Sequence, residues 1–384
     1  MPLNRIGRHF GWNNFNSHFI FYHFCRKVII TIYSEKHRLR DAKTELFGGL
    51  LVPPYESPSR ADIVLARVNS KKLGEVIAPR EFGLEPVLAL HDAGFVEFLR
   101  VAWDEWSQTE YEGEVIPTCW PARRMSQRIP DFIDGKVGYY ALSSETSISK
   151  GTWEAAVASK DVALTGAELL LNGDQTGTSL LAPLKASGVK GVFSLCRPPG
   201  HHAAFDMFGG YCFLNNAAIA AQWFRDNGIE RVAILDVDFH HGNGTQDIFY
   251  EREEVLYLSL HGDPRDAFPH FSGYSDETGQ DAGEGTTFNC PLPRGTQFKT
   301  WCDKLKECLT KIDQFGAEVL VVSLGVDTFE KDPISFFKLK SDDFLSIGKL
   351  IADLKRPTLF VMEGGYDIKE LGINVVNVLQ AFEG

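Results

Sequence analysis

The sequence predicts an α/β fold built on an open parallel sheet with helices on both faces. From residue 28 onwards, short β-branched runs alternate with longer stretches of helical periodicity, which is the pattern of repeated strand–helix–strand units. Five of the runs are apolar almost throughout, as strands covered on both faces are. They are Val189–Leu195, Arg231–Leu235, Val255–Leu260, Val319–Leu324 and Thr358–Met362.

Helices are predicted between these strands, where apolar residues recur at helical spacing. The clearest candidates are Asn215–Asn227, Trp301–Phe315 and Asp342–Leu354. The segment 172–187 is rich in Gly, Ser and Thr and is predicted to be a surface loop insertion. We expect residues 1–27, which hold basic residues, an aromatic cluster and no acid, to be an N-terminal extension, either disordered or not native.

The composition limits the kinds of partner. The chain has 384 residues, a net charge of −12 and 44% hydrophobic residues, enough for a large core. The acidic excess argues against binding nucleic acid or an anionic membrane and favours a cationic partner. No apolar run approaches the roughly 20 residues that cross a bilayer. Seven cysteines without CxxC spacing favour free thiols, so we expect a reducing, cytoplasmic location.

Polar or glycine-rich segments follow each of the five predicted strands. Open parallel sheets bind their ligands at the carboxyl ends of the strands, so we expect these segments to converge in one crevice. In chain order they are Arg197–His202, Asp236–Gly244, Ser259–Asp263, Gly325–Thr328 and Glu363–Tyr366.

Two carboxylates and one imidazole in these segments have the composition of a catalytic zinc site. The alternation of an extended segment puts Asp238 and His240 on the same side, and Asp327 can join them from a neighbouring strand. Three protein ligands with one position left for water are the form of a catalytic zinc site. A single Asp-x-His pair more often marks a turn. The gathering of polar groups at strand ends favours a site, because each unsatisfied buried polar group costs about 1–3 kcal/mol.

Longer motifs in the same segments resemble a known family. RPPGHHA, DVDFHHGNGTQDIFY, LGVDTFEKDP and MEGGY resemble the zinc-dependent histone deacetylase-like amidohydrolases of the arginase and deacetylase superfamily. KHRLRDAKTELFGG, VPPYESP, WPARR, GYCFLNNAA and SLHGDPRDAFPHFSGYSDETG are similar to its acetylpolyamine amidohydrolase branch, and the likeness covers residues 28–384. The resemblance implies one α/β domain around an eight-stranded parallel sheet.

The resemblance also implies two kinds of metal site. One zinc ion per chain would be bound by Asp238, His240 and Asp327. A structural potassium ion would be bound by a set that shares two of these residues. That set is Asp236, Asp238, His240, Ser259 and Leu260.

Catalytic roles follow from the same resemblance. His201 and His202 are implied as the tandem catalytic histidines, and Tyr366 as the residue that polarises the substrate carbonyl. Asp236 is implied as the partner that orients His201. Asn243 stands where some deacetylases have an aspartate partner for the second histidine, which leaves the charge state of His202 open.

The substrate contacts are implied in two groups. Tyr211, Phe268 and Ile334 fall where the family lines its acyl-lysine tunnel, which suits an unbranched alkyl amine. The segment 110–150 resembles an insertion that forms a homodimer and narrows the mouth of the active site. Within it, Glu145 and, at shorter reach, Asp134 match carboxylates that receive a distal substrate ammonium, unless they are only exposed charges.

The expected function is therefore zinc-dependent hydrolysis of the acetyl amide of acetylated polyamines or related small alkyl amines. Three alternatives stay open. The first is a deacetylase of acetyl-lysine in proteins, the second an arginase-like ureohydrolase with two manganese ions, and the third a non-catalytic binding module on the same fold. The second is disfavoured because the motifs do not obviously supply ligands for a second metal, and the third because every residue that the chemistry requires is present.

Overall fold

An eight-stranded parallel sheet forms the centre of the computed structural model, which describes residues 29–172 and 191–384. The strand order is β4-β1-β5-β10-β9-β6-β7-β8, and every neighbouring pair is parallel. The predicted N-terminal extension, and the predicted loop insertion from residue 173 on, lie outside the described residues. The eight strands are β1 Ile30–Ile32, β4 Val76–Ile77, β5 Gly191–Ser194, β6 Val232–Asp236, β7 Val255–Gly262, β8 Thr287–Leu292, β9 Val319–Leu324 and β10 Thr358–Met362.

The five strands predicted from the sequence are all present in this sheet, and the predicted fold class is confirmed. The last two have the predicted bounds, and β6 lies one residue later than predicted. β7 continues two residues further, to Gly262, because it pairs with β8 along its whole second half. The edge strands β1 and β4 are only 3 and 2 residues long, too short to give a periodic signal.

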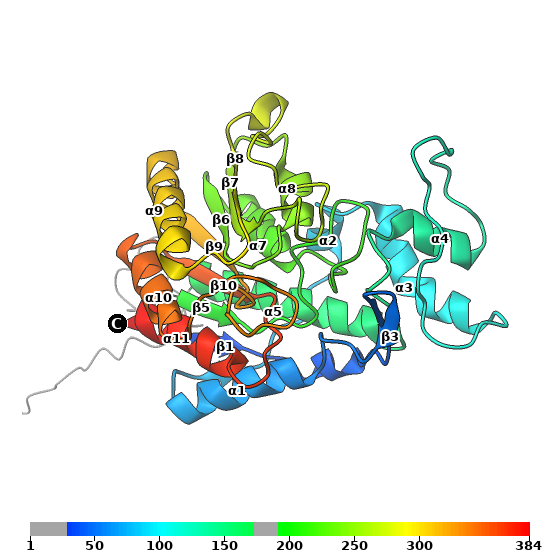
Figure 1. The fold of residues 1–384 in the computed structure, drawn as a ribbon, viewed down its shortest axis with the longest axis horizontal. Coiled ribbons are helices and arrows are strands. Elements are labelled where there is room, and N and C mark those ends of the chain that lie inside the picture. The colour runs from blue at the N-terminus through cyan, green and yellow to red at the C-terminus, as the bar shows by residue number, and fades with distance from the viewer. Residues whose placement is uncertain (1–28, 173–190) are drawn as a thin grey trace, which may run out of the picture.

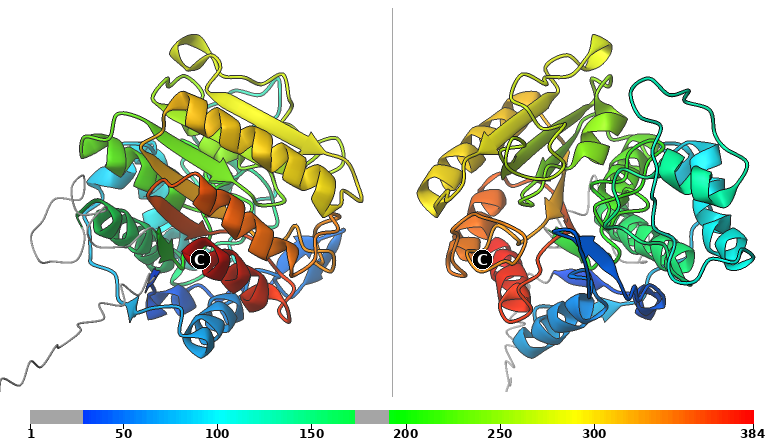
Figure 2. Two further views of the ribbon diagram at one scale, coloured as in Figure 1. Left: turned by 90° about the vertical axis from the view of Figure 1, so that its left-hand side faces the viewer. Right: turned by 45° about the vertical axis from the view of Figure 1, so that its right-hand side comes forward.

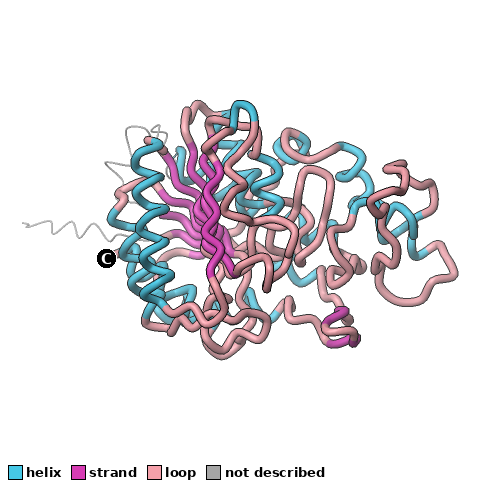
Figure 3. Tube along the Cα trace, turned by 45° about the horizontal axis from the view of Figure 1, so that its top comes forward, coloured by secondary structure: helices cyan, strands magenta, loops and turns pink. Residues whose placement is uncertain are grey.

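Helices cover both faces of the sheet, and a separate hydrophobic cluster lies under each layer. α1, α9, α10 and α11 pack on one face, and Figure 2 (left) shows the last three side by side in front of the sheet. α5, α7 and α8 pack on the other face, so the sheet is a middle layer (Figure 3). The helices are α1 Ser59–Lys71, α2 Glu85–Leu88, α3 Ala93–Ser107, α4 Ile133–Tyr140, α5 Thr152–Asn172, α7 Asn216–Asp226, α8 Asn243–Phe249, α9 Phe298–Phe315, α10 Asp343–Asp353 and α11 Leu371–Glu383, with 3₁₀ turns at Glu35–Leu39 and Asp281–Gly283.

The helix α9 shows why the sequence forms these elements. Its buried side chains include Trp301, Leu305, Cys308 and Ile312, which recur every three or four residues and so form one stripe facing the sheet. The helix ends at Gly316, whose φ of +74° is the left-handed conformation that closes many helices. The predicted helix, Trp301–Phe315, has the correct C-terminal end but begins three residues too late, since α9 begins at Phe298.

Two segments leave the layered core and approach the same end of the molecule. A small antiparallel hairpin joins β2 Glu45–Phe47 to β3 Leu50–Val52, and its turn, Gly48-Gly49, has positive φ at both residues, as a tight hairpin turn requires. The predicted insertion, residues 110–150, contains α4 and lies beyond α3, away from α9, α10 and α11 (Figure 1). Its role in forming a dimer stays a prediction. In the described part of the chain, every helix is too short or too polar to span a membrane.

The contact between α10 and α11 depends on one small residue, which gives a test of the packing. A Cβ atom at Gly348 would lie 2.0 Å from the carbonyl oxygen of Val378. We expect Gly348→Ala to push the helices apart and lower the free energy of unfolding by about 1–3 kcal/mol. Thermal unfolding would show this as a lower Tm, whereas Ser346→Ala, at an exposed position of the same helix, leaves Tm unchanged. Equal Tm values for both variants would contradict this close approach.

Candidate active site

Four neighbouring strands place the side chains of the candidate active site. β5, β10, β9 and β6 follow one another in the sheet, and since all are parallel, the loops after them start from the same edge. Polar residues predicted from the sequence lie on each of these loops. In the same order, the loops carry His201 with His202, then Tyr366, then Asp327, and finally Asp238 with His240.

The structure brings the three predicted metal ligands together. One ligand atom from each of Asp238, His240 and Asp327 lies within 4.8 Å of the other two, and all three residues are buried. Nδ1 of His240 is 2.9 Å from Oδ2 of Asp327 and 3.3 Å from Oδ1 of Asp238. Two carboxylate oxygens and one imidazole nitrogen around one point are a donor set that zinc accepts.

The backbone holds both carboxylates in place. The amide of Phe239 donates to Oδ1 of Asp327 at 2.7 Å, and the amide of Gly364 donates to Oδ2 of Asp238 at 2.8 Å. A Cβ atom at Gly364 would lie 2.5 Å from Asp238 and 2.6 Å from Asp327, so only glycine lets the chain come this close. The second oxygen of Asp327 is thereby turned towards His240, and the residues fit a bound divalent ion.

The charges of this cluster favour a cation. Burial raises the pKa of Asp327 to about 6, and the negative charge of Asp238 adds to the effect. Burial alone would lower the pKa of His240, but its hydrogen bonds to Asp238 and Asp327 raise it to about 10. The two carboxylates therefore attract positive charge strongly to the point between them, which is a requirement for binding a metal ion.

The tandem histidines have opposite electrostatic environments. Nδ1 of His201 is 3.0 Å from Oδ2 of Asp236, and Nδ1 of His202 is 2.8 Å from Oδ1 of Asn243. Burial opposes protonation of His201, yet the charges of Asp238 and Asp236 raise its pKa to about 10. Burial and the neighbouring histidines lower the pKa of His202 well below its ordinary value. Adjacent groups with opposite shifts suit paired acid and base roles.

Contacts at its backbone and at its ring hold Tyr366 in place. The Oδ2 atom of Asp332 accepts a hydrogen bond from the Tyr366 amide at 2.7 Å. Arg60 donates from Nε to the carbonyl oxygen of Gly365 at 2.7 Å, and its Cζ lies 4.6 Å from the centre of the Tyr366 ring. Burial raises the pKa of Tyr366 well above its ordinary value. The hydroxyl therefore keeps its proton and can donate to a developing oxyanion.

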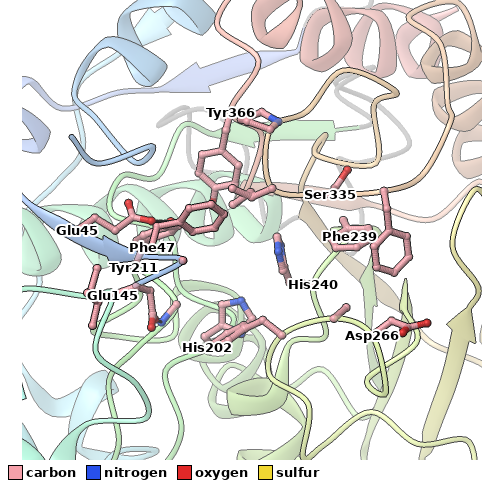
Figure 4. A pocket seen from close by; sticks show the side chains of 18 of the residues that line it. Glu45, Phe47, Glu145, His202, Tyr211, Phe239, His240, Asp266, Ser335 and Tyr366 are labelled. Atoms are coloured by element: carbon pink, nitrogen blue, oxygen red, sulfur yellow. Dashed lines mark hydrogen bonds between the residues drawn. The ribbon is translucent and has the colours of Figure 1, made fainter. Parts of the chain in front are cut away.

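A pocket of about 400 Å³ opens onto these residues, and Figure 4 shows it from close by. Its wall combines aromatic rings with a few charged groups. The predicted residues that line it are Glu145, His202, Tyr211, His240, Phe268, Ile334 and Tyr366, and further lining residues include Glu45, Phe47, Phe239, Asp266, Arg294 and Phe336. Asp134 is not among them: it is half-buried in the first turn of α4.

Sequence reasoning missed Glu45, although a signal was present. Glu45 lies in β2, and the Gly48-Gly49 pair between apolar residues is typical of a hairpin turn. Its Oε1 atom accepts a hydrogen bond from the Tyr211 hydroxyl at 2.8 Å, across 166 positions of sequence. Nothing local in the sequence indicates that contact.

A buried ion-pair network behind the pocket was also missed. Glu56 accepts from Arg197 at 2.8 and 3.0 Å and from Arg60 at 3.1 Å, and Arg40 lies 3.8 Å away. Burial raises the pKa of Glu56, but the charges of Arg197, Arg60 and Arg40 outweigh it and hold the pKa below the usual range. Because Arg197 begins the histidine loop and Arg60 holds the loop before Tyr366, the network joins both halves of the site.

The predicted potassium ligands lie in adjacent strands. Asp236 in β6 pairs in register with Ser259 in β7, and both are fully buried, as is Leu260. The Oγ atom of Ser259 is 2.8 Å from Nδ1 of His261. Potassium binding at these residues stays a prediction.

Comparisons with known proteins agree with this geometry. Residues 54–382 match the histone deacetylase domain family. The chain is 56% identical to the acetylpolyamine amidohydrolase of Mycoplana ramosa over 92% of this chain and 99% of that protein. It is 53% identical to acetylpolyamine amidohydrolase 2 of Pseudomonas aeruginosa, over 93% and 99% of the two chains. The crystal structure of the acetylpolyamine aminohydrolase from Burkholderia pseudomallei matches with a TM-score of 0.84 at 33% identity, over 92% of this chain and 98% of that one.

The chain therefore belongs to the histone deacetylase family and is a hydrolase of the deacetylase class. Within this family, it belongs with the acetylpolyamine amidohydrolases. The arginase-like alternative and the non-catalytic alternative are set aside by this assignment.

The neutral partner of His202 gives a test of its ionisation. In the Asn243→Asp variant a carboxylate replaces the amide beside Nδ1, which favours the protonated ring and raises the pKa of His202. His202 must be neutral to accept a proton, so in this variant it becomes active as a base only at a higher pH. We expect the acidic limb of the kcat/KM profile to move to higher pH. Asn227→Asp, the same change at the exposed end of α7, should leave the profile in place.

An acidic limb that does not move in Asn243→Asp would show that the ionisation of His202 does not limit the reaction.

Proposed function

We propose that the protein hydrolyses the acetyl amide of acetylated polyamines and related small alkyl amines, releasing acetate and the free amine. The observation that carries this proposal is a single pocket lined at once by His202 and Tyr366, by the metal-cluster residue His240, and by the carboxylate Glu145. The names of the relatives at 50–56% identity support the same substrate class.

The side chains suit amide hydrolysis. We assign Asp238, His240 and Asp327 as the ligands of one zinc ion, which when bound would polarise the acetyl carbonyl and make water a better nucleophile. His202, held neutral by burial, accepts a proton from the attacking water. His201, whose Nδ1 atom lies 3.0 Å from the carboxylate of Asp236, supplies a proton for the departing amine.

Tyr366 completes the chemistry on the opposite side of the pocket from His202 (Figure 4). Its buried hydroxyl donates a hydrogen bond to the oxygen that becomes negative as the carbonyl is attacked. Asp332 and Arg60 keep the backbone on each side of it in position. The tyrosine therefore stabilises the transition state more than the ground state.

The walls of the pocket suit an acylated alkyl amine. The Phe268 ring lies edge-on to His202 with 5.0 Å between centres, and Tyr211 lies edge-on to Tyr366 at 5.7 Å. The apolar faces of these aromatic rings favour an unbranched methylene chain. Glu145, which accepts a hydrogen bond from the Gly210 amide at 2.9 Å, supplies negative charge for a distal ammonium.

The remaining assignments are finer. We propose that Asp236, Asp238, His240, Ser259 and Leu260 bind a structural potassium ion. We propose also that segment 110–150 forms a homodimer interface, in which Asp134 would approach the substrate. The enzyme would act in the cytoplasm on a cationic small molecule, without nucleic-acid or membrane partners. A narrowed mouth would disfavour a folded protein substrate.

A panel of substrates tests the proposed activity. We expect the zinc-loaded enzyme to release acetate from acetylputrescine, acetylcadaverine and acetylspermidine with a kcat/KM at least about 10-fold above that for an acetyl-lysine peptide, because a charge-assisted contact to the free amine is lost in the peptide. Acetate release is measured directly, with His202→Ala as the inactive control. A preference for the peptide would overturn the proposal in favour of protein deacetylation.

Metal binding gives a second test. The Asp327→Asn variant replaces a charged ligand by a neutral one, so we expect zinc affinity to fall by more than the roughly 10- to 100-fold that loss of an outer partner causes. Competition with a chromophoric chelator measures the affinity, and circular dichroism checks the fold. Asp353→Asn, exposed at the end of α10, should bind one zinc per chain like the unmodified protein. Unchanged affinity in Asp327→Asn would remove Asp327 from the ligand set.

A further inference from the structure

Two carboxylates, those of Glu45 and Glu145, lie on one wall of the pocket. Glu45 and Glu145 both line the pocket, and in the part of the chain that the structure describes neither forms an ion pair with a lysine, arginine or histidine. Glu45 accepts from the Tyr211 hydroxyl at 2.8 Å and from the Tyr55 amide at 3.1 Å. Glu145 accepts only from neutral donors too, namely Ser143, Thr146 and the Gly210 amide.

The surroundings of Glu45 make this lack of a counter-charge costly. Glu45 is 1% exposed, and its two oxygens each accept a hydrogen bond, as both oxygens of an ionised carboxylate can. Burial raises its pKa, and the nearby charge of Glu145 acts in the same direction. A buried negative charge is expensive unless a cation compensates it. The two carboxylates would therefore be relieved by a positively charged ligand between or beside them.

Tyr211 sets the separation of the two carboxylates. The amide of Gly210, next to Tyr211, donates to Glu145, whereas the hydroxyl at the far end of the Tyr211 side chain donates to Glu45. Tyr211 itself is held in a left-handed backbone conformation with φ of +66°, and its amide donates to Thr146 at 2.7 Å. Figure 4 shows Glu45, Tyr211 and Glu145 on the same side of the pocket, with Asp266 on the opposite side. The two carboxylates thus lie at opposite ends of one tyrosine.

We propose that Glu45 is a specificity-determining residue, which together with Glu145 selects acetylated amines that carry two ammonium groups over those that carry one. The inference rests on the proposed function and names the substrate class within it. A substrate with two ammonium groups can place one beside each carboxylate, whereas a substrate with one ammonium group can meet only one of them. The contact is strong because Glu45 acts inside a pocket where water screens charge poorly.

The test compares kcat/KM of the unmodified enzyme and of the Glu45→Gln variant on three substrates that differ in their number of ammonium groups. N-butylacetamide carries no ammonium group, acetylputrescine carries one, and N8-acetylspermidine carries two. For Glu45→Gln we expect kcat/KM to fall about 10-fold or more on acetylspermidine, by less on acetylputrescine, and not at all on N-butylacetamide. The loss should lie in KM, since chemistry at the acetyl group is untouched.

Two control variants separate this role from simple positioning of Tyr211. Tyr211→Phe removes the hydroxyl that Glu45 holds but keeps the Glu45 charge, so the preference for acetylspermidine over acetylputrescine should persist. Glu253→Gln removes a charge from an exposed turn before β7 that does not line the pocket, and it should change kcat/KM on none of the three substrates. Equal losses of Glu45→Gln on all three substrates, or no loss on any, would overturn the proposal.

A measurement on the unmodified enzyme covers the case in which Glu45→Gln fails to fold. Spermidine, putrescine and butylamine are compared as competitive inhibitors, and we expect inhibition constants that rise in this order by about 10-fold per lost charge. Equal constants for spermidine and putrescine overturn the role of Glu45 while leaving the deacetylase proposal intact. An unmodified enzyme that releases no acetate from any acetylated amine overturns both.

Discussion

The site depends on two buried carboxylates that face one point and repel each other. Asp236 and Ser323 pair in register across β6 and β9, so the loops that carry Asp238 and Asp327 begin side by side. Backbone amides and a glycine hold the carboxylates there, at an electrostatic cost that only a positive charge can offset. The two loops therefore meet at a point that suits a cation, and separate contacts hold His201, His202 and Tyr366 beside it.

The ion-pair network around Glu56 compensates another set of buried charges. Bringing guanidinium groups into the interior is unfavourable unless they are paired, and one carboxylate partners three of them. Arg60 also donates to the backbone carbonyls of Glu363 and Gly365, just before Tyr366. The buried ion pairs thus connect the loop that begins at Arg197 with the loop before Tyr366, although these loops are far apart in the sequence. Removing Glu56 would leave uncompensated charges beside Tyr366.

The central strands and the chemistry were predictable from the sequence because both leave local signals. Strands buried on both faces are continuously apolar, and the residues after them are polar, so β6, β9 and the positions of Asp238, His240 and Asp327 followed from pattern and family resemblance. The edge strands β1 and β4 are too short for any periodicity. Glu45 and Glu56 were missed because the contacts that connect them to the site, with Tyr211 and Arg197, span more than a hundred positions, so no spacing rule indicates them.

The predicted residues and the missed residue Glu45 lie in different parts of the fold. The residues that we propose to react lie on loops that start directly at the ends of sheet strands, where the strand register fixes their positions. The carboxylates Glu45 and Glu145 lie outside the sheet, on a hairpin and at the end of the insertion, and reach the pocket through contacts with Tyr211 and Gly210. Such peripheral segments can change without disturbing the sheet, so substrate choice can vary while the hydrolytic chemistry stays the same.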